Sequence, residues 1–561
     1  MNSYRLNLAI LALILCSACV KLDLDPLSQS ATGNFYNNQK ELELAVNDLY
    51  HVNFWENDNE EYTDNFWHRA SGGNAITFGN MDAENPIADS LWSRAYRAIA
   101  RANSLLENMD DAAESTPEAV MLRIEAEARL ARAYQYMRLV THFGDVPLMT
   151  ETPELEDAYD VQRTAMETIV DFIFTELDWA AEHLPASYGG DVKRFTKGLA
   201  WAIKARAALY TGHWAEARDA AAAVMQLANE GIHGLYGDYR QLFLPPGAIS
   251  NEVVFSVPRS QEHGLSSTAL YARDFISRST GGYGAQLPTW ELMDSYECTD
   301  GLPIDQSPLY NPHDPFANRD PRLSMTIVPF GEVWLGVTYQ PHPDSLTVWS
   351  VRDNQRISNL DNRAVNVFAS YTGLLWKKRV DESWVTRFTE DNDAIIFRYA
   401  EVLLTYAEAK VELGEVDQSV LDAINSVRAR AYGVEVGSTG DYPAVATTDI
   451  AALRTLIKRE RRVEFAQEGL RYMDLIRWRL AERALTQPVL GLPDPADQDR
   501  DNWPFAGAPT IDADGMLDYS ALMGHAKILA ERNFDRSRQY LWPIPASERR
   551  LNPQLDQNPN Y

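Results

Sequence analysis

Two stretches decide the fold: GLAWAIKARAALYTGHWAEARDAAAAVMQL at residues 198–227 and YAEVLLTYAEAKVELGEVDQSVLDAINSVR at residues 399–428. Each reads as a helix, a glycine turn at Gly212 or Gly414, and a second helix. Counted back from the glycine, the stretches share two alanine positions (Ala205 and Ala207, Ala407 and Ala409). Small residues there let helices approach closely, as in tetratricopeptide repeats, where helix pairs bury their faces by stacking. The two copies lie about 200 residues apart, so they form no continuous array in the sequence.

The chain around these stretches divides into helical and irregular parts. Apolar residues at helical spacing predict helices over 41–52 and 88–109, a long helix from Pro117 to about residue 140, and another over 164–183. Residues 231–395 are rich in Gly, Pro, Asn, Asp and aromatics, with strand-like fragments at 252–257 and 324–328. We therefore expect a mostly α protein: a tetratricopeptide-like helical-repeat scaffold that holds an irregular, loop-rich α+β lobe.

Composition narrows the class of protein. The chain has 561 residues, with 51 Lys+Arg against 80 Asp+Glu, and a formal net charge of −29. A hydrophobic content of 45% and a mean hydropathy of −0.34 describe a globular chain and exclude a polytopic membrane protein and wholesale disorder. The negative charge argues against a nucleic-acid partner. It would also repel polyanions, unless a local patch of Arg69, Arg273 or Arg278 reverses the balance.

The N-terminus has the pattern of an export signal. Arg5 precedes ten almost uniformly apolar residues, a run too short to span a bilayer, and Ser17-Ala18 stand directly before Cys19. This ending is similar to a bacterial lipoprotein cleavage box, although Cys16 stands where such boxes usually carry Leu. We expect a signal peptide over 1–18 and a lipidated Cys19 at the start of a tether over 19–38. An ordinary signal peptide with an incidental cysteine is the alternative.

Five ordered motifs resemble those of the SusD/RagB family. They are the turn Thr141-His142-Phe143-Gly144-Asp145-Val146-Pro147-Leu148; the pair Asp300-Gly301-Leu302-Pro303-Ile304 and Asn318-Arg319-Asp320-Pro321-Arg322-Leu323; the helix that begins Phe397-Arg398-Tyr399-Ala400-Glu401; the block Arg459-Glu460-Arg461-Arg462-Val463-Glu464-Phe465 with Asp474-Leu475-Ile476-Arg477-Trp478; and the ending Tyr540-Leu541-Trp542-Pro543-Ile544-Pro545. The resemblance extends over essentially the whole mature chain, and five motifs in order are far more specific than any one of them.

The resemblance implies a non-catalytic, surface-exposed glycan-binding lipoprotein of the cell outer membrane. Such proteins capture oligosaccharides or polysaccharides and act as a hinged lid on a SusC-like TonB-dependent transporter; those that resemble RagB capture peptides instead. For this chain the resemblance implies an N-terminal helical region over 39–230, a variable ligand lobe over 231–395, a helical repeat region over 396–485 and a C-terminal segment over 486–561. It implies no nucleic acid and no cofactor.

The ligand-binding residues are expected in loops, because sugars present apolar C–H faces to flat rings and hydroxyls to polar side chains. The first candidate is the loop over 53–80, for which we predict ligand contacts from Trp55, Asp58, Asp64, Trp67, Arg69, Asn74 and Phe78. The second is the glycine-flanked Tyr283, and the third is Trp334 with Tyr339 in the variable lobe. For any one of these aromatics, packing in a core is at least as good an interpretation.

Other motifs are interpreted as scaffold. Arg459, Arg461 and Arg462 have glutamates three and four positions away, which favours an ion-pair network between helices over a ligand site. Trp542 is expected in the core. Enzymatic patterns are weak: the chain has no His-Glu-x-x-His, no Gly-x-Ser-x-Gly and no phosphate loop, and we expect no metal site. A glycosidase or esterase remains the alternative class, because 80 acids make carboxylate pairs unavoidable.

Overall fold

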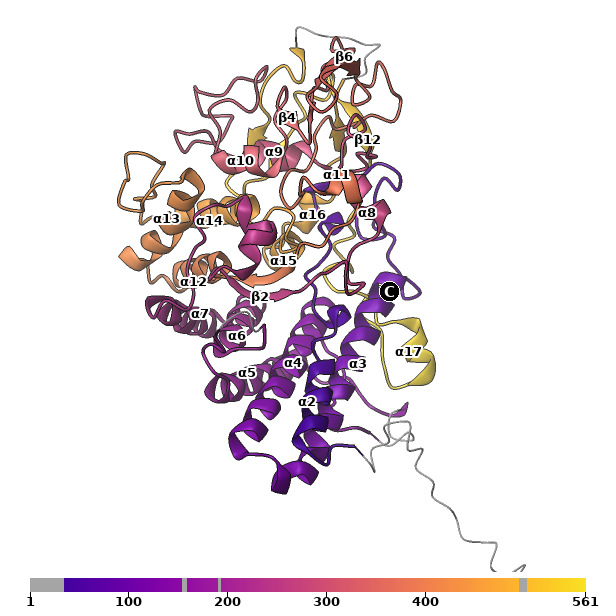
Figure 1. Ribbon diagram of the computed structural model, residues 1–561, viewed down its shortest axis with the longest axis vertical. Coiled ribbons are helices and arrows are strands. Elements are labelled where there is room, and N and C mark those ends of the chain that lie inside the picture. Colours follow the sequence, from indigo (N-terminus) through magenta and orange to yellow (C-terminus); the bar gives the residue numbers. More distant parts are fainter. Residues whose placement is uncertain (1–34, 154–158, 190–192, 494–501) are drawn as a thin grey trace, which may run out of the picture.

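A stack of helices forms one half of the molecule and a loop-rich lobe forms the other (Figure 1). The computed structural model describes residues 35–153, 159–189, 193–493 and 502–561. Cys19 and the signal peptide lie outside these ranges. The first part contains α2 (Gln39–Asp48), α3 (Pro86–Asn108), α4 (Glu118–Phe143), α5 (Met166–His183), α6 (Lys197–Thr211) and α7 (Trp214–Asn229). These bounds confirm the helices expected from the sequence.

The two similar stretches meet in space. The second stretch forms α12 (Tyr399–Leu413) and α13 (Gln418–Tyr432), and α12 packs against both α6 and α7. Contacts run from α3 to α4, α5, α6, α7, α12 and α13, so the array is continuous although the sequence interrupts it (Figure 1). The paired alanines of α6 and α12 are all buried (Ala205, Ala207, Ala407, Ala409), which confirms close helix packing at these positions.

Local signals explain where these helices begin and end. The Thr196 side chain accepts a hydrogen bond from the first turn of α6, and the Asp417 side chain does the same for α13. Gly212 and Gly414 end α6 and α12 in the left-handed region, with φ of 79° and 72°. Gly144 likewise ends α4, at a φ of 72°. Glycine adopts this conformation without the penalty that a Cβ atom would bring.

A two-stranded ribbon carries the inserted lobe. Strand β2 (Val253–Val257) follows α7, strand β8 (Ala394–Arg398) precedes α12, and the two pair antiparallel with Val253 opposite Arg398. The chain therefore leaves the helical array and returns to it at one place, which is why α12 can pack on α7 after an insertion of more than a hundred residues.

The lobe has short elements and its own core. Its only sheet of four strands among the described residues has the order β4-β5-β6-β7 (Val333–Trp334, Val337–Thr338, Thr347–Ser350, Gln355–Ser358). Two-stranded pairs are β1 (Phe66–His68) with β3 (Gln286–Pro288), β9 (Val489–Gly491) with β12 (Lys527–Ala530), and β10 (Thr510–Ile511) with β11 (Leu517–Asp518). One apolar core extends through the helical array, and a second, rich in Trp, fills the lobe.

The remaining helices and turns complete the structure. They are α8 (Ala269–Phe275), α9 (Trp290–Ser295), α10 (Pro321–Thr326), α11 (Trp384–Arg387), α14 (Ile450–Glu464), α15 (Arg471–Arg477), α16 (Ala481–Ala484) and α17 (Ala546–Leu551), with 3-10 turns η2 (Val52–Phe54), η3 (Glu60–Tyr62), η4 (Met109–Ser115), η6 (Gln241–Phe243) and η7 (Pro245–Ile249). The strand expected at 324–328 is wrong, because α10 covers its first residues. Asp320 caps that helix and Pro321 starts it, and both favour a helical turn over a strand.

A buried network of charges joins the lobe to the array. Glu464, at the end of α14, is fully buried and accepts hydrogen bonds from Arg398 of β8 at 2.7 Å and from Arg322 of α10 at 2.9 Å. Arg430 of α13 is its third partner. Burial alone would raise the pKa of Glu464, but the charges of these three arginines outweigh it and hold the pKa well below its usual range.

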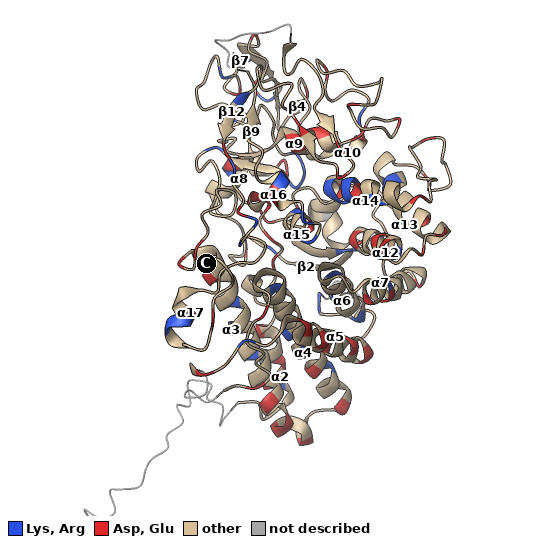
Figure 2. Cartoon of the chain, turned by 180° about the vertical axis from the view of Figure 1, so that it is seen from behind, with Lys and Arg blue, Asp and Glu red and all other residues tan. Residues whose placement is uncertain are grey.

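The network extends along α14. Further pairs are Arg322 with Asp320 and Glu460, Arg428 with Glu460 and Glu297, Arg461 with Asp474, Arg462 with Asp64, and Arg398 with Glu252 and Glu468. Figure 2 shows the basic residues of α14 beside acidic residues of neighbouring elements. This confirms the scaffold interpretation of the arginine-rich block. The partners lie mostly on other elements rather than one turn away, and Arg459, for example, pairs with Glu297.

Replacing Glu464 by Gln is expected to lower the free energy of unfolding by about 3–5 kcal/mol, because three buried guanidinium groups lose their shared carboxylate. Urea denaturation measures the change. Glu84→Gln is the matched control: the Glu84–Arg550 pair is exposed, and its loss should cost less than about 1 kcal/mol. Equal losses in both variants would contradict a central role for Glu464.

Stability should also fall steeply in acid. Burial would raise the pKa values of Asp64, Asp320 and Asp474, but neighbouring arginines outweigh it and hold all three below their usual range. Their contribution is full above the unfolded pKa of about 4 and is lost as the pH falls toward their folded values. Asp294, whose pKa burial raises to about 6, acts in the opposite direction between pH about 4 and 6. Urea denaturation from pH 7 to 3 should therefore show its steepest loss below pH about 4.

Candidate functional site

The segment over 53–80 packs on both halves: Trp55 lies in the core of the helical array, and Phe66 and Trp67 lie in the core of the lobe. Its turns η2 and η3 lead to β1, which pairs antiparallel with β3 so that Trp67 lies opposite Leu287. The segment therefore lies beside Tyr283, the second candidate, which follows α8 in the chain. Arg69 of the segment donates a hydrogen bond to the Tyr283 carbonyl.

Four of the predicted ring contacts lie in the cores. Trp55 is 2% exposed and stacks on Tyr134 with ring centroids 4.4 Å apart. Trp67 is 5% exposed and lies against Tyr371, and the other two, Trp334 and Tyr339, are equally buried in the lobe. The expectation that these rings are displayed at the surface is wrong. The physical reason is that large rings fill the spaces between short elements. Those spaces form only when segments distant in the sequence come together in the folded chain.

The predicted polar contacts in this segment support the fold. Asp64 is buried and pairs with Arg462 and Arg471, each at 2.9 Å. The Asn74 amide donates to the Glu61 carbonyl at 2.7 Å. The expectation that Asp64 lies at an exposed rim is therefore wrong, because its carboxylate belongs to the buried charge network. Phe78 keeps an exposed ring, with 37% of its surface accessible.

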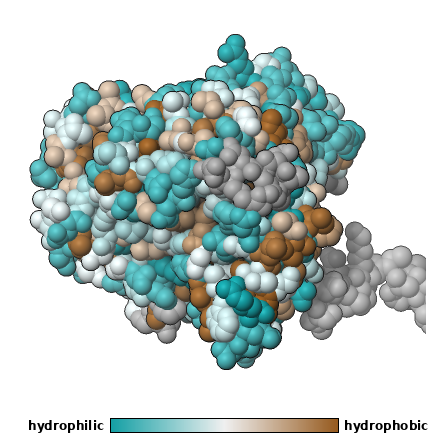
Figure 3. All heavy atoms as spheres, turned by 90° about the horizontal axis from the view of Figure 1, so that it is seen from above, coloured by the Kyte–Doolittle hydropathy of each residue, from teal (hydrophilic) through white to brown (hydrophobic). Residues whose placement is uncertain are grey.

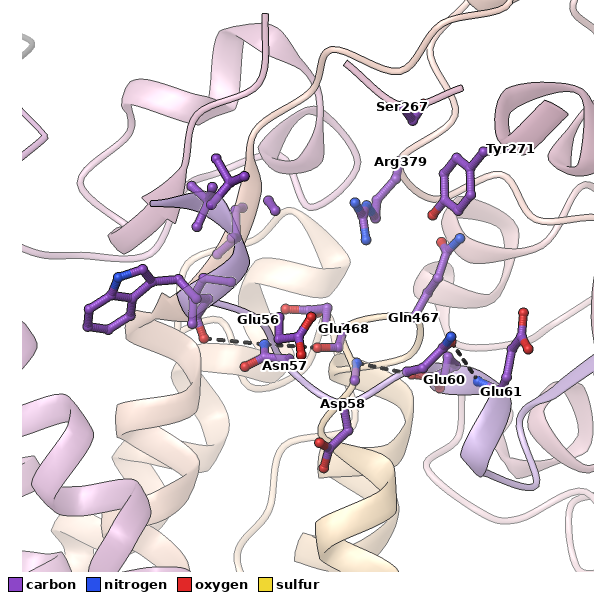
Figure 4. A pocket seen from close by; sticks show the side chains of 18 of the residues that line it. Glu56, Asn57, Asp58, Glu60, Glu61, Ser267, Tyr271, Arg379, Gln467 and Glu468 are labelled. Atoms are coloured by element: carbon purple, nitrogen blue, oxygen red, sulfur yellow. Dashed lines mark hydrogen bonds between the residues drawn. The ribbon is translucent and has the colours of Figure 1, made fainter. Parts of the chain in front are cut away.

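A polar cavity of about 810 Å³ lies between the lobe and the helical array. The turns over 52–62 line it on one side, with α8, β8 and the segment at 467–469 around it. Figure 4 shows carboxylates of this lining, including Glu56, Asp58, Glu60 and Glu61, with Arg379 across from them. Trp55 and Asp58, both predicted from the sequence, belong to this lining.

Most charges of the cavity wall are engaged in the fold. Asp58 accepts hydrogen bonds from Arg138 and His142, both at 3.0 Å. Burial alone would raise its pKa, but the charges of His142 and Arg138 hold the pKa below its usual value. Both carboxylate oxygens of Glu60 accept hydrogen bonds, from Asn65 at 2.8 Å and from the backbone N–H of Gly469 at 3.1 Å, while burial raises its pKa. The cavity wall thus holds the two halves together.

The structure brings Arg69 and Tyr283 together at the surface of the lobe. Arg69 donates to the Phe368 carbonyl at 2.7 Å and to the Tyr283 carbonyl at 3.2 Å. Arg273 donates to the Tyr283 hydroxyl at 3.3 Å, and Arg278 donates to the Phe368 carbonyl. We call these five residues, Arg69, Arg273, Arg278, Tyr283 and Phe368, the arginine–aromatic cluster.

Guanidinium groups lie over the rings of the cluster. The carbon at the centre of the Arg69 guanidinium lies 5.7 Å from the Phe368 ring centroid, and that of Arg278 lies 5.2 Å from it. Arg273 is 5.7 Å from the Tyr283 ring. Phe368 is 58% exposed, so its ring offers an apolar face bordered by hydrogen-bond donors. Sugars are recognised by this combination of ring face and polar rim.

Backbone geometry holds the cluster in place. A Cβ atom at Gly282 would come within 2.2 Å of the Ile276 carbonyl oxygen, so only glycine allows this close turn before Tyr283. The buried Asp361 accepts hydrogen bonds from the backbone N–H groups of Arg278 and Ser279, at 2.8 and 3.2 Å, and so ties this turn to the loop that carries Phe368.

Phe368 was missed from the sequence. The sequence signal that could have indicated it is the group of apolar residues Val365, Val367 and Phe368 in an irregular segment. All three side chains are exposed in the structure. Seen from above, hydrophobic side chains form several separate groups among hydrophilic ones, the largest at the lower right (Figure 3). Exposed apolar groups of this kind are typical of binding surfaces.

Two features are absent from the described residues. No helix in these ranges is long and apolar enough to cross a membrane. No group of three or more His, Cys, Asp or Glu side chains in the same ranges could hold a metal ion.

Comparisons with known proteins agree along the whole chain. The family model described as the SusD family matches residues 251–561, and one described as "Starch-binding associating with outer membrane" matches residues 22–209. A SusD-like carbohydrate-binding protein from Bacteroides fragilis is 30% identical, with a TM-score of 0.76 over 93% of this chain and 100% of that one. A second SusD-like structure from this organism is 24% identical, with a TM-score of 0.72 over 94% and 98% of the two chains. SusD-like protein P25 of Formosa agariphila is 25% identical over 82% of this chain and 87% of its own.

Trp67→Ala should separate packing from ligand contact. Because the ring is buried, we expect the free energy of unfolding to fall by about 3–5 kcal/mol. Phe368→Ala removes an exposed ring and should change it by less than about 1 kcal/mol. Urea denaturation of both variants provides the comparison. A Trp67→Ala protein as stable as the parent chain would show that the ring is not part of the core.

Proposed function

The chain belongs to the SusD family, and from that premise we propose that it captures carbohydrate and passes it on unchanged. The proposed binding site is the arginine–aromatic cluster of the lobe. Oligosaccharides or polysaccharides would be held there and delivered to a partner SusC-like TonB-dependent transporter of the outer membrane. The chain itself would be non-catalytic.

One observation carries the choice of site. Phe368 presents an exposed ring, and the guanidinium groups of Arg69 and Arg278 border it within 6 Å of the ring centroid. A sugar can place its C–H face on the ring while its hydroxyl groups accept hydrogen bonds from the arginines. The likeness to a carbohydrate-binding structure that is 30% identical over nearly the whole chain supports the same ligand class.

The proposal includes attachment to the outer membrane through lipid on Cys19, at the exposed face of the cell. A membrane anchor would raise the local concentration of a weak glycan-binding site near its transporter, and docking on the transporter would add a second point of attachment. The family model that describes association with the outer membrane supports this location.

Two acids of the cavity, Asp58 and Glu60, are engaged in the fold. Glycoside hydrolysis needs one carboxyl group that can donate a proton and a second that faces the sugar or a water molecule. In this cavity both oxygens of Glu60 accept hydrogen bonds, and Asp58 is paired with Arg138 and His142. We therefore assign these acids to the wall that joins lobe and array.

Phe368→Ala is expected to weaken retention of a bound glycan about tenfold, since loss of one stacking surface removes about 1–1.5 kcal/mol. Affinity gel electrophoresis against a panel of polysaccharides identifies the ligand, and isothermal calorimetry with the purified chain measures the change.

Trp349→Ala is the matched control, because Trp349 is an exposed aromatic of the same lobe, in β6, outside the cluster. Its affinity should equal that of the parent chain. Chromatography of the bound glycan after incubation should recover it at its original length. Shortened products, or binding of peptides in place of every polysaccharide, would overturn the proposed function.

A further inference from the structure

We propose that the carbohydrate bound at the arginine–aromatic cluster is an anionic polysaccharide, whose carboxylate or sulfate groups contact Arg278 and its neighbours. This inference rests on the proposed function and adds the chemical class of the ligand. It runs against the overall charge of −29, which by itself favours neutral ligands.

The first argument is the local balance of charge. Among the described residues, no Asp or Glu forms an ion pair with Arg69, Arg273 or Arg278, although acids outnumber bases 80 to 51 in the chain. Most buried arginines elsewhere pair with carboxylates: Arg398, for example, contacts Glu252, Glu464 and Glu468. Three guanidinium groups gathered at one surface thus keep their charge available to an external anion.

The second argument is repulsion within the cluster. Arg69 and Arg278 donate to the same carbonyl oxygen, that of Phe368, and lie over the same ring. Burial and then the charge of Arg278 lower the pKa of Arg69, as expected for two guanidinium groups held at one oxygen. An anion placed between them would relieve this repulsion and gain charge-assisted hydrogen bonds.

The third argument is the remaining donor capacity. Arg278 uses only its Nε–H within the described part of the chain, and its two terminal nitrogens donate no hydrogen bond there. A guanidinium fork of this kind matches two oxygens of a carboxylate or sulfate. The group lies beside the exposed Phe368 ring, so one charged sugar could stack on the ring and pair with the fork.

The acids nearest in the fold do not fill this role. Asp361 is buried, and its carboxylate oxygens accept hydrogen bonds from the backbone N–H groups of Arg278 and Ser279. Asp274 is buried beside His68, with 3.8 Å between the imidazole Nε2 and the carboxylate. Both contribute to the field at the cluster, but neither covers the terminal nitrogens of Arg278.

Isothermal calorimetry with the purified chain and three probes tests the proposal: polygalacturonate for carboxylate, chondroitin sulfate for sulfate, and laminarin as a neutral glucan. We expect at least one anionic probe to bind at least tenfold more tightly than laminarin in 50 mM NaCl. That affinity should fall at least fivefold in 500 mM NaCl, because salt screens exposed charges. Arg278→Gln should weaken anionic binding about tenfold, and Arg278→Lys, which keeps the charge, should restore part of it.

Arg356→Gln is the matched control, because Arg356 is an exposed arginine of the same lobe, in β7, and is not part of the cluster. It should leave binding of every probe unchanged. Circular dichroism of each variant confirms that it is folded. If laminarin binds as tightly as the anionic probes and Phe368→Ala weakens it, the anionic inference fails and the proposed function stands. If no polysaccharide binds, both fail.

Discussion

The buried carboxylate of Glu464 is the interaction on which the rest of the structure depends. It binds arginines from β8, α10 and α13, elements that come from the ribbon, the lobe and the helical array. An unpaired charge in that buried position would be costly, so the carboxylate favours the arrangement that brings these elements together. The network therefore holds the inserted lobe against the helical array at the point where the chain returns to it, the ribbon of β2 and β8.

That rigid junction supports the surface of loops that carries the proposed binding site. Few hydrogen-bonded strands order the lobe, but its Trp-rich core and the buried Asp361 hold the turns that carry Tyr283 and Phe368. Binding residues on loops are effective when a scaffold positions them, because less conformational entropy is lost when the ligand arrives. The helices stabilise the fold, and the loops carry the residues of the proposed site.

The partners of the arginines also differ between the buried scaffold and the surface cluster. Many arginines inside the molecule pair with carboxylates and hold elements together, as Arg322 and Arg398 do. Arg69, Arg273 and Arg278 lie beside aromatic rings instead, with carbonyl or hydroxyl oxygens as partners. A strongly acidic chain can therefore present a locally basic surface.

Sequence alone determined the helices, their glycine and proline boundaries, the repeat and the family, because these depend on local periodicity, caps and ordered motifs. It also identified Arg69 and Tyr283 as candidates and the arginine-rich block of α14 as scaffold. Only the tertiary structure decided that Trp67 and Trp334 fill the lobe core, that Asp64 pairs with Arg471, and that Phe368 is exposed between two arginines. Whether a ring is buried depends on segments distant in the sequence that pack against it, and one chain's residue pattern does not contain that information.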